Sequence, residues 1–313
     1  MYRYIARALL LGIPTLIGVF TIVFFIMRVI PGDPVLQLYG DAAQPEIIQR
    51  LRESMGLTRP LAVQYVDYLW DAVHGDLGRS FRTNRPVANE IFAVFPHTVL
   101  LAFSGIVISC VIGLPLGIIA ARKRGTRSDF IAMIAALLGV SAPIFWVAIL
   151  LMIVFAVKLR WFPLLGLGNP ADPRDLAAHL VLPAFALGLA GAGWMARITR
   201  SAMLDTLNQD YVRTARAKGI GEPRVVVRHA LKNALIPIIT ILGVLLSRLL
   251  GGSILTETVF ARPGLGKLLI DSISQRDYPQ IQASITFFAA LIIVVNILVD
   301  ISYAAFDPRI RYR

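Results

Sequence analysis

Six long apolar runs constrain the fold of this 313-residue chain more than any other feature of its sequence. They cover residues 9–30, 97–121, 130–157, 180–199, 235–256 and 283–304. A helix of about 20 apolar residues crosses the hydrocarbon core of a bilayer. The runs lack the alternation of membrane β-barrel strands, and only 16% of the residues are charged. We therefore predict an all-α integral membrane protein with six transmembrane helices.

The first run is predicted to remain in the protein as an N-terminal transmembrane helix, residues 1–30. Arg3 and Arg7 stand ahead of it, an arrangement that also occurs in secretory signals. The run is longer than the apolar part of a signal, however, and continues into "RVIPGDP" without a small-residue cleavage site. The one cysteine, Cys110, lies in the second run, so an intrachain disulfide is excluded.

The basic residues are distributed unevenly between the polar segments that connect the runs. The N-terminus, 122–129, 197–234 and the segment after 304 together hold 17 Lys and Arg against five Asp and Glu. The rest of the chain holds 14 of each, so the whole net charge of +12 falls in the first set. Basic residues confined to one set of segments are typical of a membrane protein with a fixed orientation. The net positive charge therefore no longer supports nucleic-acid binding.

The charge distribution also predicts an orientation, because basic residues near the ends of spans mark the cytoplasmic side. Both termini are then cytoplasmic, and 31–96, 158–179 and 257–282 face outward. We expect a multi-pass protein of a bacterial or archaeal plasma membrane, which is the inner membrane if the cell is Gram-negative.

The largest outward segment, 31–96, is predicted to form a small helical extracytoplasmic cap. Helical periodicity occurs twice in it. One apolar face comprises Ile47, Ile48, Leu51 and Met55, and the other comprises Leu61, Tyr65, Tyr68, Leu69 and Ala72. Gly56 and prolines separate the two helices. A short loop would suffice to join two spans, so this segment is expected to cover something or to meet a partner.

The inner segment 200–234 has a distinctive order of elements. Gln209 to Lys218 is predicted to be a short helix that Gly219 and Gly221 end, and Glu222-Pro223 suits the start of a second helix. The second helix carries a basic stripe, with an apolar face roughly opposite. The stripe is Arg224, Arg228 and Lys232, and the apolar face is Val226, Ala230 and Ala234. A basic amphipathic helix lying at the lipid headgroups would explain the charges, but neither the first helix nor the glycine break.

The segment "DYVRTARAKGIGEPRVVVRHALKNALIPIIT" resembles the cytoplasmic "EAA" loop of ABC importer permeases, in the form of the dipeptide, oligopeptide and nickel branch. Further similar segments follow in the family's order over nearly the whole chain. They are "RVIPGDP", "GLTRPL", "GDLGRSFRTNRPV", "GSILTETVFARPGLGKLLIDSISQRDYPQIQ" and "NILVDISYAAFDPRIR". The chain departs from the general pattern in two ways. It has Arg213, Thr214 and Ala215 where Glu-Ala-Ala is usual, and its proline comes later after the glycine. Both departures are similar to the peptide branch.

The resemblance implies a type I ABC importer permease fold, with a transmembrane core at 97–304 and a cytoplasmic tail at 305–313. It implies that the helix before the glycine docks on a separate ATPase, with 211–221 as the coupling element. By this analogy the residues at 214, 215 and 219 allow the helix to approach the ATPase closely, and basic side chains supply polar contacts to it. The coupling residues expected on this basis are Tyr211, Arg213, Thr214, Ala215, Arg216, Lys218, Gly219 and Gly221.

The same resemblance implies a complex with several partners. These are a second, similar permease subunit, two ATPase subunits that bind ATP and Mg, an extracytoplasmic solute-binding protein and the membrane lipid. The chain itself is expected to bind no cofactor. The cargo is left open among dipeptides, oligopeptides, glutathione, nickel chelates, sugars and opines, because the binding protein sets much of the choice.

Two ionisable residues lie inside the predicted spans, where a charge costs a few kcal/mol. Asp300 is expected to be structural and to pair with arginines near the inner leaflet. Arg248 lies near the middle of the fifth span. It either faces the translocation path and meets an anionic group, or packs against backbone carbonyls or a partner.

The sequence gives no support for catalysis by this chain. "ARPGLGKLL" at 261–269 has a glycine-lysine pair, but a phosphate loop requires glycine where Ala261 stands and Ser or Thr where Leu268 stands. The four histidines have no metal-ligand spacing, and no nucleophile–base pair is indicated. The predicted function is therefore translocation in an ATP-driven importer. The alternative is an ion-coupled secondary transporter, although such proteins often show repeats that this chain lacks.

Overall fold

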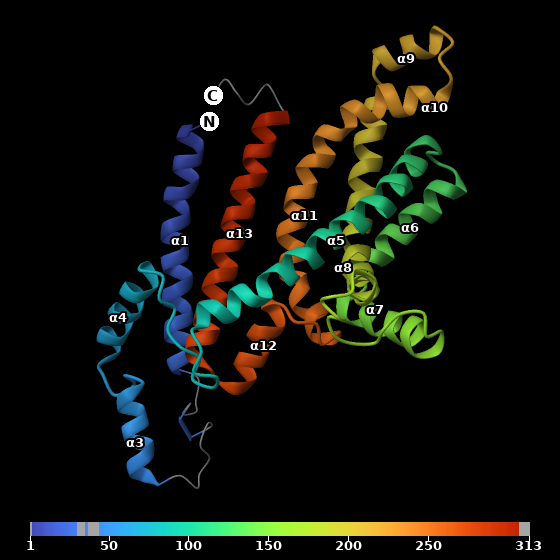
Figure 1. Cartoon of the computed structure of the whole chain (residues 1–313). Helices are drawn as coiled ribbons and strands as arrows, with labels where there is room; N and C mark the ends of the chain where they lie inside the picture. The colour runs from blue at the N-terminus through green and yellow to red at the C-terminus, as the bar shows by residue number, and fades with distance from the viewer. Residues whose placement is uncertain (1, 30–34, 37–43, 307–313) are drawn as a thin grey trace. The chain divides into compact units, whose positions relative to one another are not determined.

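The computed structural model describes residues 2–29, 35, 36 and 44–306, with side chains at 2–9, 236, 240, 300 and 302–306 outside the description. Within these residues the chain is helical (Figure 1). It divides into two compact units. Unit 1 comprises 98–262 and the described residues from Val295 on, and unit 2 comprises the described residues of 2–97 together with 263–294. The predicted core, 97–304, is therefore shared between the two units.

Five helices are long and apolar enough to cross a membrane, and a bent pair brings the number to six. The five are α1 (Tyr2–Val29), α5 (Val87–Arg122), α8 (Pro173–Leu207), α11 (Leu231–Val259) and α13 (Tyr278–Phe306). Each contains one of the predicted apolar runs, except that residue 30 of the first run lies outside the described residues. The prediction of an all-α membrane protein is thus confirmed for the described part of the chain.

The third predicted span, 130–157, is not one continuous helix. It consists of α6 (Arg127–Ser141) followed by α7 (Ile144–Leu151) and the π-helix η1 (Met152–Lys158), with a bend of 103° between the two parts. Ala142 is extended and Pro143 follows it. Proline disfavours the helical conformation of the residue before it, which favours a break at this position.

Small residues bring the helices of unit 1 into close contact. A Cβ atom built on Gly113 or Gly117 of α5 would lie 2.6–2.7 Å from backbone oxygens of α8. Gly193 of α8 faces α6 in the same way, because its Cβ position lies 2.2 Å from the carbonyl oxygen of Ala136. These glycines let the helix backbones touch.

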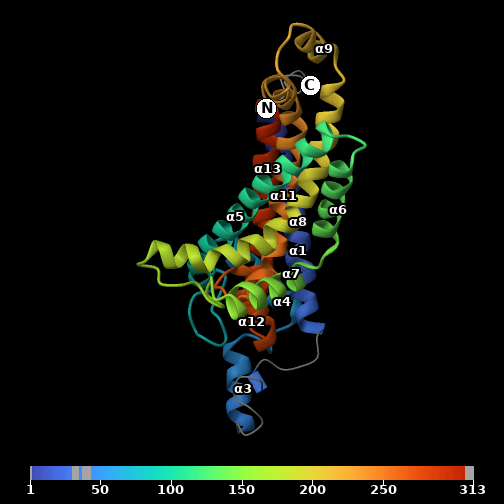
Figure 2. The ribbon, with the colours of Figure 1, turned by 90° about the vertical axis from the view of Figure 1, so that its right-hand side faces the viewer.

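At one end of unit 1, α8 leads into three short elements. They are α9 (Asp210–Ala217), α10 (Glu222–Arg224) and the π-helix η2 (Val225–Ala230), which continues into α11. Figures 1 and 2 show α9 and α10 at the same end of the unit as the turn between α5 and α6, with α7 at the other end. The two basic segments of this unit, 122–129 and 197–234, therefore share one end, as the charge distribution predicts.

Unit 2 contains the two short helices expected within 31–96, α3 (Pro45–Ser54) and α4 (Leu61–Val73), and also α12 (Leu265–Gln275). Tyr65 and Tyr68 of α4 contact the ring of Phe20 on α1, with centroid separations of 5.8 and 5.1 Å. Of the predicted apolar faces, Ile47 and Leu61 are exposed. The side of the membrane on which these helices lie stays a prediction.

Candidate functional site

The predicted helix–glycine–helix element is present in the structure. Helix α9 ends at Ala217, and Gly219 has a φ of +77°, the left-handed conformation that favours glycine. Gly221 is extended and precedes α10, which begins at Glu222 with Pro223 in its first turn. The glycine break therefore reverses the chain between α9 and the helix that leads into α11.

One face of α9 is buried in the core of unit 1. Val212 and Ala215 are 0% and 6% exposed, and they belong to the same apolar cluster as Val225 and Val226 of η2. The small Ala215 side chain thus packs against other residues of this chain. The other residues expected in the coupling element are exposed. They are Tyr211, Arg213, Thr214, Arg216, Lys218, Gly219 and Gly221.

An ion pair closes the turn around Gly219. The Arg216 guanidinium donates two hydrogen bonds to the Glu222 carboxylate, at 3.0 and 2.8 Å. The Arg216 side chain lowers the pKa of Glu222 and in turn has its own pKa raised. A carboxyl whose pKa is lowered on folding stabilises the folded state at pH values above its pKa in the unfolded chain. This stabilisation is lost as the pH falls through its pKa in the folded state. The pair is therefore complete at neutral pH.

Two other exposed residues of α9 have polar partners. Asn233 of α11 donates a hydrogen bond of 2.7 Å from Nδ2 to the Tyr211 hydroxyl, which ties α9 to the start of the next span. Arg213 lies 3.7 Å from Asp210, and both side chains are largely exposed, so this ion pair stabilises little.

The second helix has the two faces that the sequence predicts. Arg224, Arg228 and Lys232 are exposed, whereas the apolar residues opposite are buried. The π-helical geometry of η2 was not part of the prediction. Both interpretations of the basic stripe, contact with lipid headgroups and contact with a protein, are compatible with its exposure.

Arg248 is exposed on α11, and its guanidinium lies over an aromatic ring. Its Cζ is 4.8 Å from the ring centroid of Trp194 on α8, and Arg197 contacts the same ring at 4.9 Å. Neither arginine forms an ion pair with a carboxylate of the described residues. Two guanidinium groups therefore share one indole.

Asp300 lies in α13, but its side chain is outside the described part of the structure. Its pairing with arginines stays a prediction.

The described residues contain no cluster of three or more His, Cys, Asp or Glu placed to hold a metal ion. The lysine of the "PGLGK" segment, Lys267, bonds the Asp271 carboxylate at 2.8 and 3.0 Å within α12.

Two polar contacts between helices were missed by the sequence analysis. Arg200 of α8 forms a two-bond ion pair with Asp129 of α6, at 2.7 and 2.8 Å. Glu257, fully buried near the end of α11, accepts a 2.7 Å hydrogen bond from Thr98 of α5. Each pair joins helices that are remote in sequence, and no local spacing pattern indicates which helices meet.

Comparison with known proteins decides the family. The pattern of the family described as "Binding-protein-dependent transport system inner membrane component" matches residues 113–312, and that of its N-terminal part matches residues 1–102. The chain belongs to this family. It is thus a permease component of a transport system and a multi-pass inner membrane protein.

Relatives of this permease match it over its whole length. It is 41% identical over 333 residues to a dipeptide transport system permease protein of Alkalihalophilus pseudofirmus. It is 44% identical over 313 residues to a glutathione transport system permease protein of Escherichia coli, and 43% identical over 335 residues to a di/tripeptide transport system permease protein of Pseudomonas aeruginosa. In each comparison 100% of both chains is covered.

Solved structures confirm the fold class. A chain of the MetNI methionine ABC transporter, in an inward-facing conformation, matches with a TM-score of 0.59 and 19% identity. The match covers 69% of the permease and 96% of that chain. The permease therefore has the type I ABC importer fold, and the alternative of an ion-coupled secondary transporter is not supported.

Proposed function

We propose that this chain is a permease subunit of an ATP-driven importer for di- or oligopeptides or a related small solute. The observation that carries the proposal is the exposed face of α9, presented on a helix whose opposite face is seated in the core of unit 1. The names of the full-length relatives support peptides as the cargo class.

In the proposed complex α9 docks on a separate ATPase at the cytoplasmic side. Val212 and Ala215 anchor α9 to η2, and η2 continues without interruption into α11. The Arg216–Glu222 pair and the Tyr211–Asn233 hydrogen bond resist bending of the loop. A displacement of α9 is thereby transmitted to α8 and α11 rather than absorbed by the loop, which is the mechanical requirement for tilting a span.

The proposed partners are those of an importer complex. A second, similar permease completes the translocation path, two ATPase subunits bind ATP and Mg²⁺, and an extracytoplasmic binding protein delivers the solute. Both termini lie in the cytoplasm, and 31–96 forms the outer cap. Hydrolysis takes place in the ATPase subunits, and this chain supplies the path and the docking helix.

Purification of the tagged chain, coexpressed with its candidate partners, tests the proposed function. We expect an ATPase to copurify, and uptake of a dipeptide into proteoliposomes to require internal ATP and to be blocked by vanadate. Uptake that proceeds without ATP, driven by a proton or sodium gradient alone, would contradict the proposal.

We further propose that Arg248 faces the translocation path and meets an anionic group of the solute, such as a carboxylate. An unpaired guanidinium within a span is costly, so an anionic partner in transit is favourable. Exchange to Met keeps the length of the side chain and removes the charge. For Arg248→Met we expect uptake of a dipeptide with an acidic side chain to fall about tenfold relative to a neutral one, which corresponds to about 1.4 kcal/mol.

Arg197→Met is the matched control, because it removes the other cation from the same Trp194 ring. If only the cation–π contact mattered, both variants would behave alike. Unchanged selectivity between the acidic and the neutral dipeptide in Arg248→Met would show that Arg248 does not line the path.

A further inference from the structure

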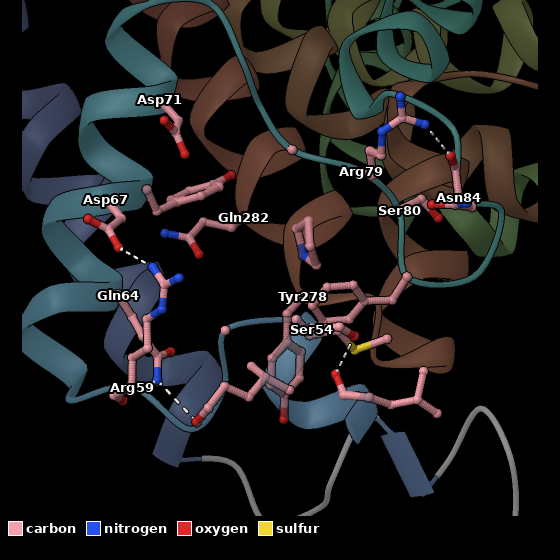
Figure 3. Close-up of a pocket in the computed structure, with 18 of the residues that line it drawn as sticks. Ser54, Arg59, Gln64, Asp67, Asp71, Arg79, Ser80, Asn84, Tyr278 and Gln282 are labelled. Carbon is pink, nitrogen blue, oxygen red and sulfur yellow. Dashed lines mark hydrogen bonds and ion pairs between the residues drawn. The ribbon is translucent and has the colours of Figure 1, made fainter. Parts of the chain in front are cut away.

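Unit 2 contains a polar pocket with a volume of about 690 Å³ (Figure 3). It lies between α4, the turn after α3, the loop at 78–84 and the first turns of α13. Its size is within the range of small-molecule sites, which is about 300–1,000 Å³. Neither the coupling helix nor Arg248 contributes to it, so it is a separate candidate site.

Two buried polar groups of the pocket lack a hydrogen-bond partner among the described residues. Gln282 is 3% exposed, and its Nε2 donates to no acceptor there; the Tyr68 hydroxyl is equally unpaired. Figure 3 shows the Gln282 amide reaching from α13 toward α4. An unpaired buried polar group is unfavourable, so two in one pocket indicate a ligand with hydrogen-bond acceptors. Burial raises the pKa of Tyr68, which keeps its hydroxyl protonated as a donor.

A guanidinium lies in the same pocket. Arg28 donates from Nε to Gln64 Oε1 and from Nη1 to the Phe24 carbonyl oxygen, both at 3.1 Å. Its Cζ lies 3.3 Å from the Phe24 ring centroid, and no carboxylate of the described residues pairs with it. The remaining amino group, Nη2, has no acceptor among the described residues and can donate to a ligand.

The charges around the pocket favour an anion. Four arginines and two aspartates line it, and they are Arg28, Arg59, Arg79, Arg82, Asp67 and Asp71. Arg59 is neutralised by Asp67 at 3.0 Å, and Arg79 donates to the Asn84 carbonyl oxygen. An excess of positive charge remains, together with amide and hydroxyl donors. This combination suits a carboxylate, which has two oxygens and about four acceptor sites.

We propose that this pocket binds a carboxylate group, held by Gln282, Tyr68 and Arg28. The group comes either from the C-terminus of a free peptide or from an acidic side chain of the binding protein. The second source rests on the proposed function, because it requires the extracytoplasmic partner.

Hydroxyl and amide deletions in the complete transporter, reconstituted in nanodiscs, test this site. The variants are Tyr68→Phe and Gln282→Leu. Tyr65→Phe is the matched control, because Tyr65 lies on the same helix but its hydroxyl bonds Thr21 at 2.7 Å and does not line the pocket. Tyr68→Phe removes an unpaired hydroxyl, so no loss of folding is expected. ATPase activity without binding protein is measured in each variant, which tests the proposed function separately.

Two measurements separate the two sources of the carboxylate. The first is binding of the dipeptide Ala-Ala against its C-terminal amide, and the second is affinity of the complex for its immobilised binding protein. We expect Tyr68→Phe and Gln282→Leu to weaken one of these interactions about tenfold, with Tyr65→Phe like wild type. A loss confined to Ala-Ala assigns the free peptide, and a loss confined to the binding protein assigns its acidic side chain. If neither measurement changes in either variant, the proposed site is wrong.

Discussion

Exchange of Gly193 to valine is expected to reduce the yield of folded protein at least tenfold. A Cβ at this position would lie 2.2 Å from the Ala136 carbonyl oxygen and 2.7 Å from a methyl of Val140. Overpacking costs typically about 1–3 kcal/mol when side chains can yield. Here the nearest atom belongs to the backbone of α6, which cannot change rotamer as a side chain can. The helices α6 and α8 must therefore move apart where they contact each other. The measurement is thermal stability and monodispersity of the detergent-solubilised protein by size-exclusion chromatography.

Gly251→Val is the matched control for this experiment. Gly251 is also within a span, in α11, but a Cβ there would meet no atom within 4 Å in this chain. Both variants carry the same loss of glycine and the same β-branched side chain, so any difference reports the close approach. Equal stability of Gly193→Val and Gly251→Val would contradict the packing of α6 against α8.

Exchange of Gly219 to valine is expected to reduce ATP-driven uptake more than tenfold at a normal level of protein in the membrane. Space is not the reason, because no atom lies within 4 Å of a Cβ there. The reason is the φ of +77°, which costs an L-residue about 1–2 kcal/mol and a β-branched one more. The turn would relax and move α9 away from its seat on η2. Uptake and ATPase activity in proteoliposomes measure the effect.

Two variants isolate the backbone as the cause. Gly221 is equally open but has a φ of −61°, so Gly221→Val is expected to retain most of the activity. Asparagine tolerates the left-handed region better than other L-residues with a Cβ, so Gly219→Asn should recover much of the loss. Full uptake by Gly219→Val would show that the turn at this glycine has no part in coupling.

The membrane helices could be predicted from the sequence because span length and charge asymmetry are local properties. Each apolar run corresponds to a helix or to the bent pair α6–α7. The break at Pro143 could not be predicted in the same way. Membrane helices often contain proline without breaking, as α8 does at Pro183 and α11 at Pro237. The presence of proline alone therefore does not determine whether a helix breaks.

The inner segment 200–234 was predictable in outline and not in detail. The glycine break and the basic stripe follow from spacing, and the structure has both. The burial of Ala215, the stacking of Arg248 on Trp194 and the Asp129–Arg200 pair do not follow from spacing. Each depends on which helices meet, and α6, α8 and α11 come together only through long-range packing.

The most direct test of the proposed docking of α9 is a cross-link from this helix to an ATPase subunit. A photoreactive residue at the exposed Thr214 is compared with one at the exposed Val227, which lies on η2 beyond the turn. Both are introduced into the complete complex in native membranes. We predict a cross-linked product with an ATPase from position 214, and a weaker one or none from position 227. If position 214 yields no ATPase product while the complex is intact, α9 is not the docking helix.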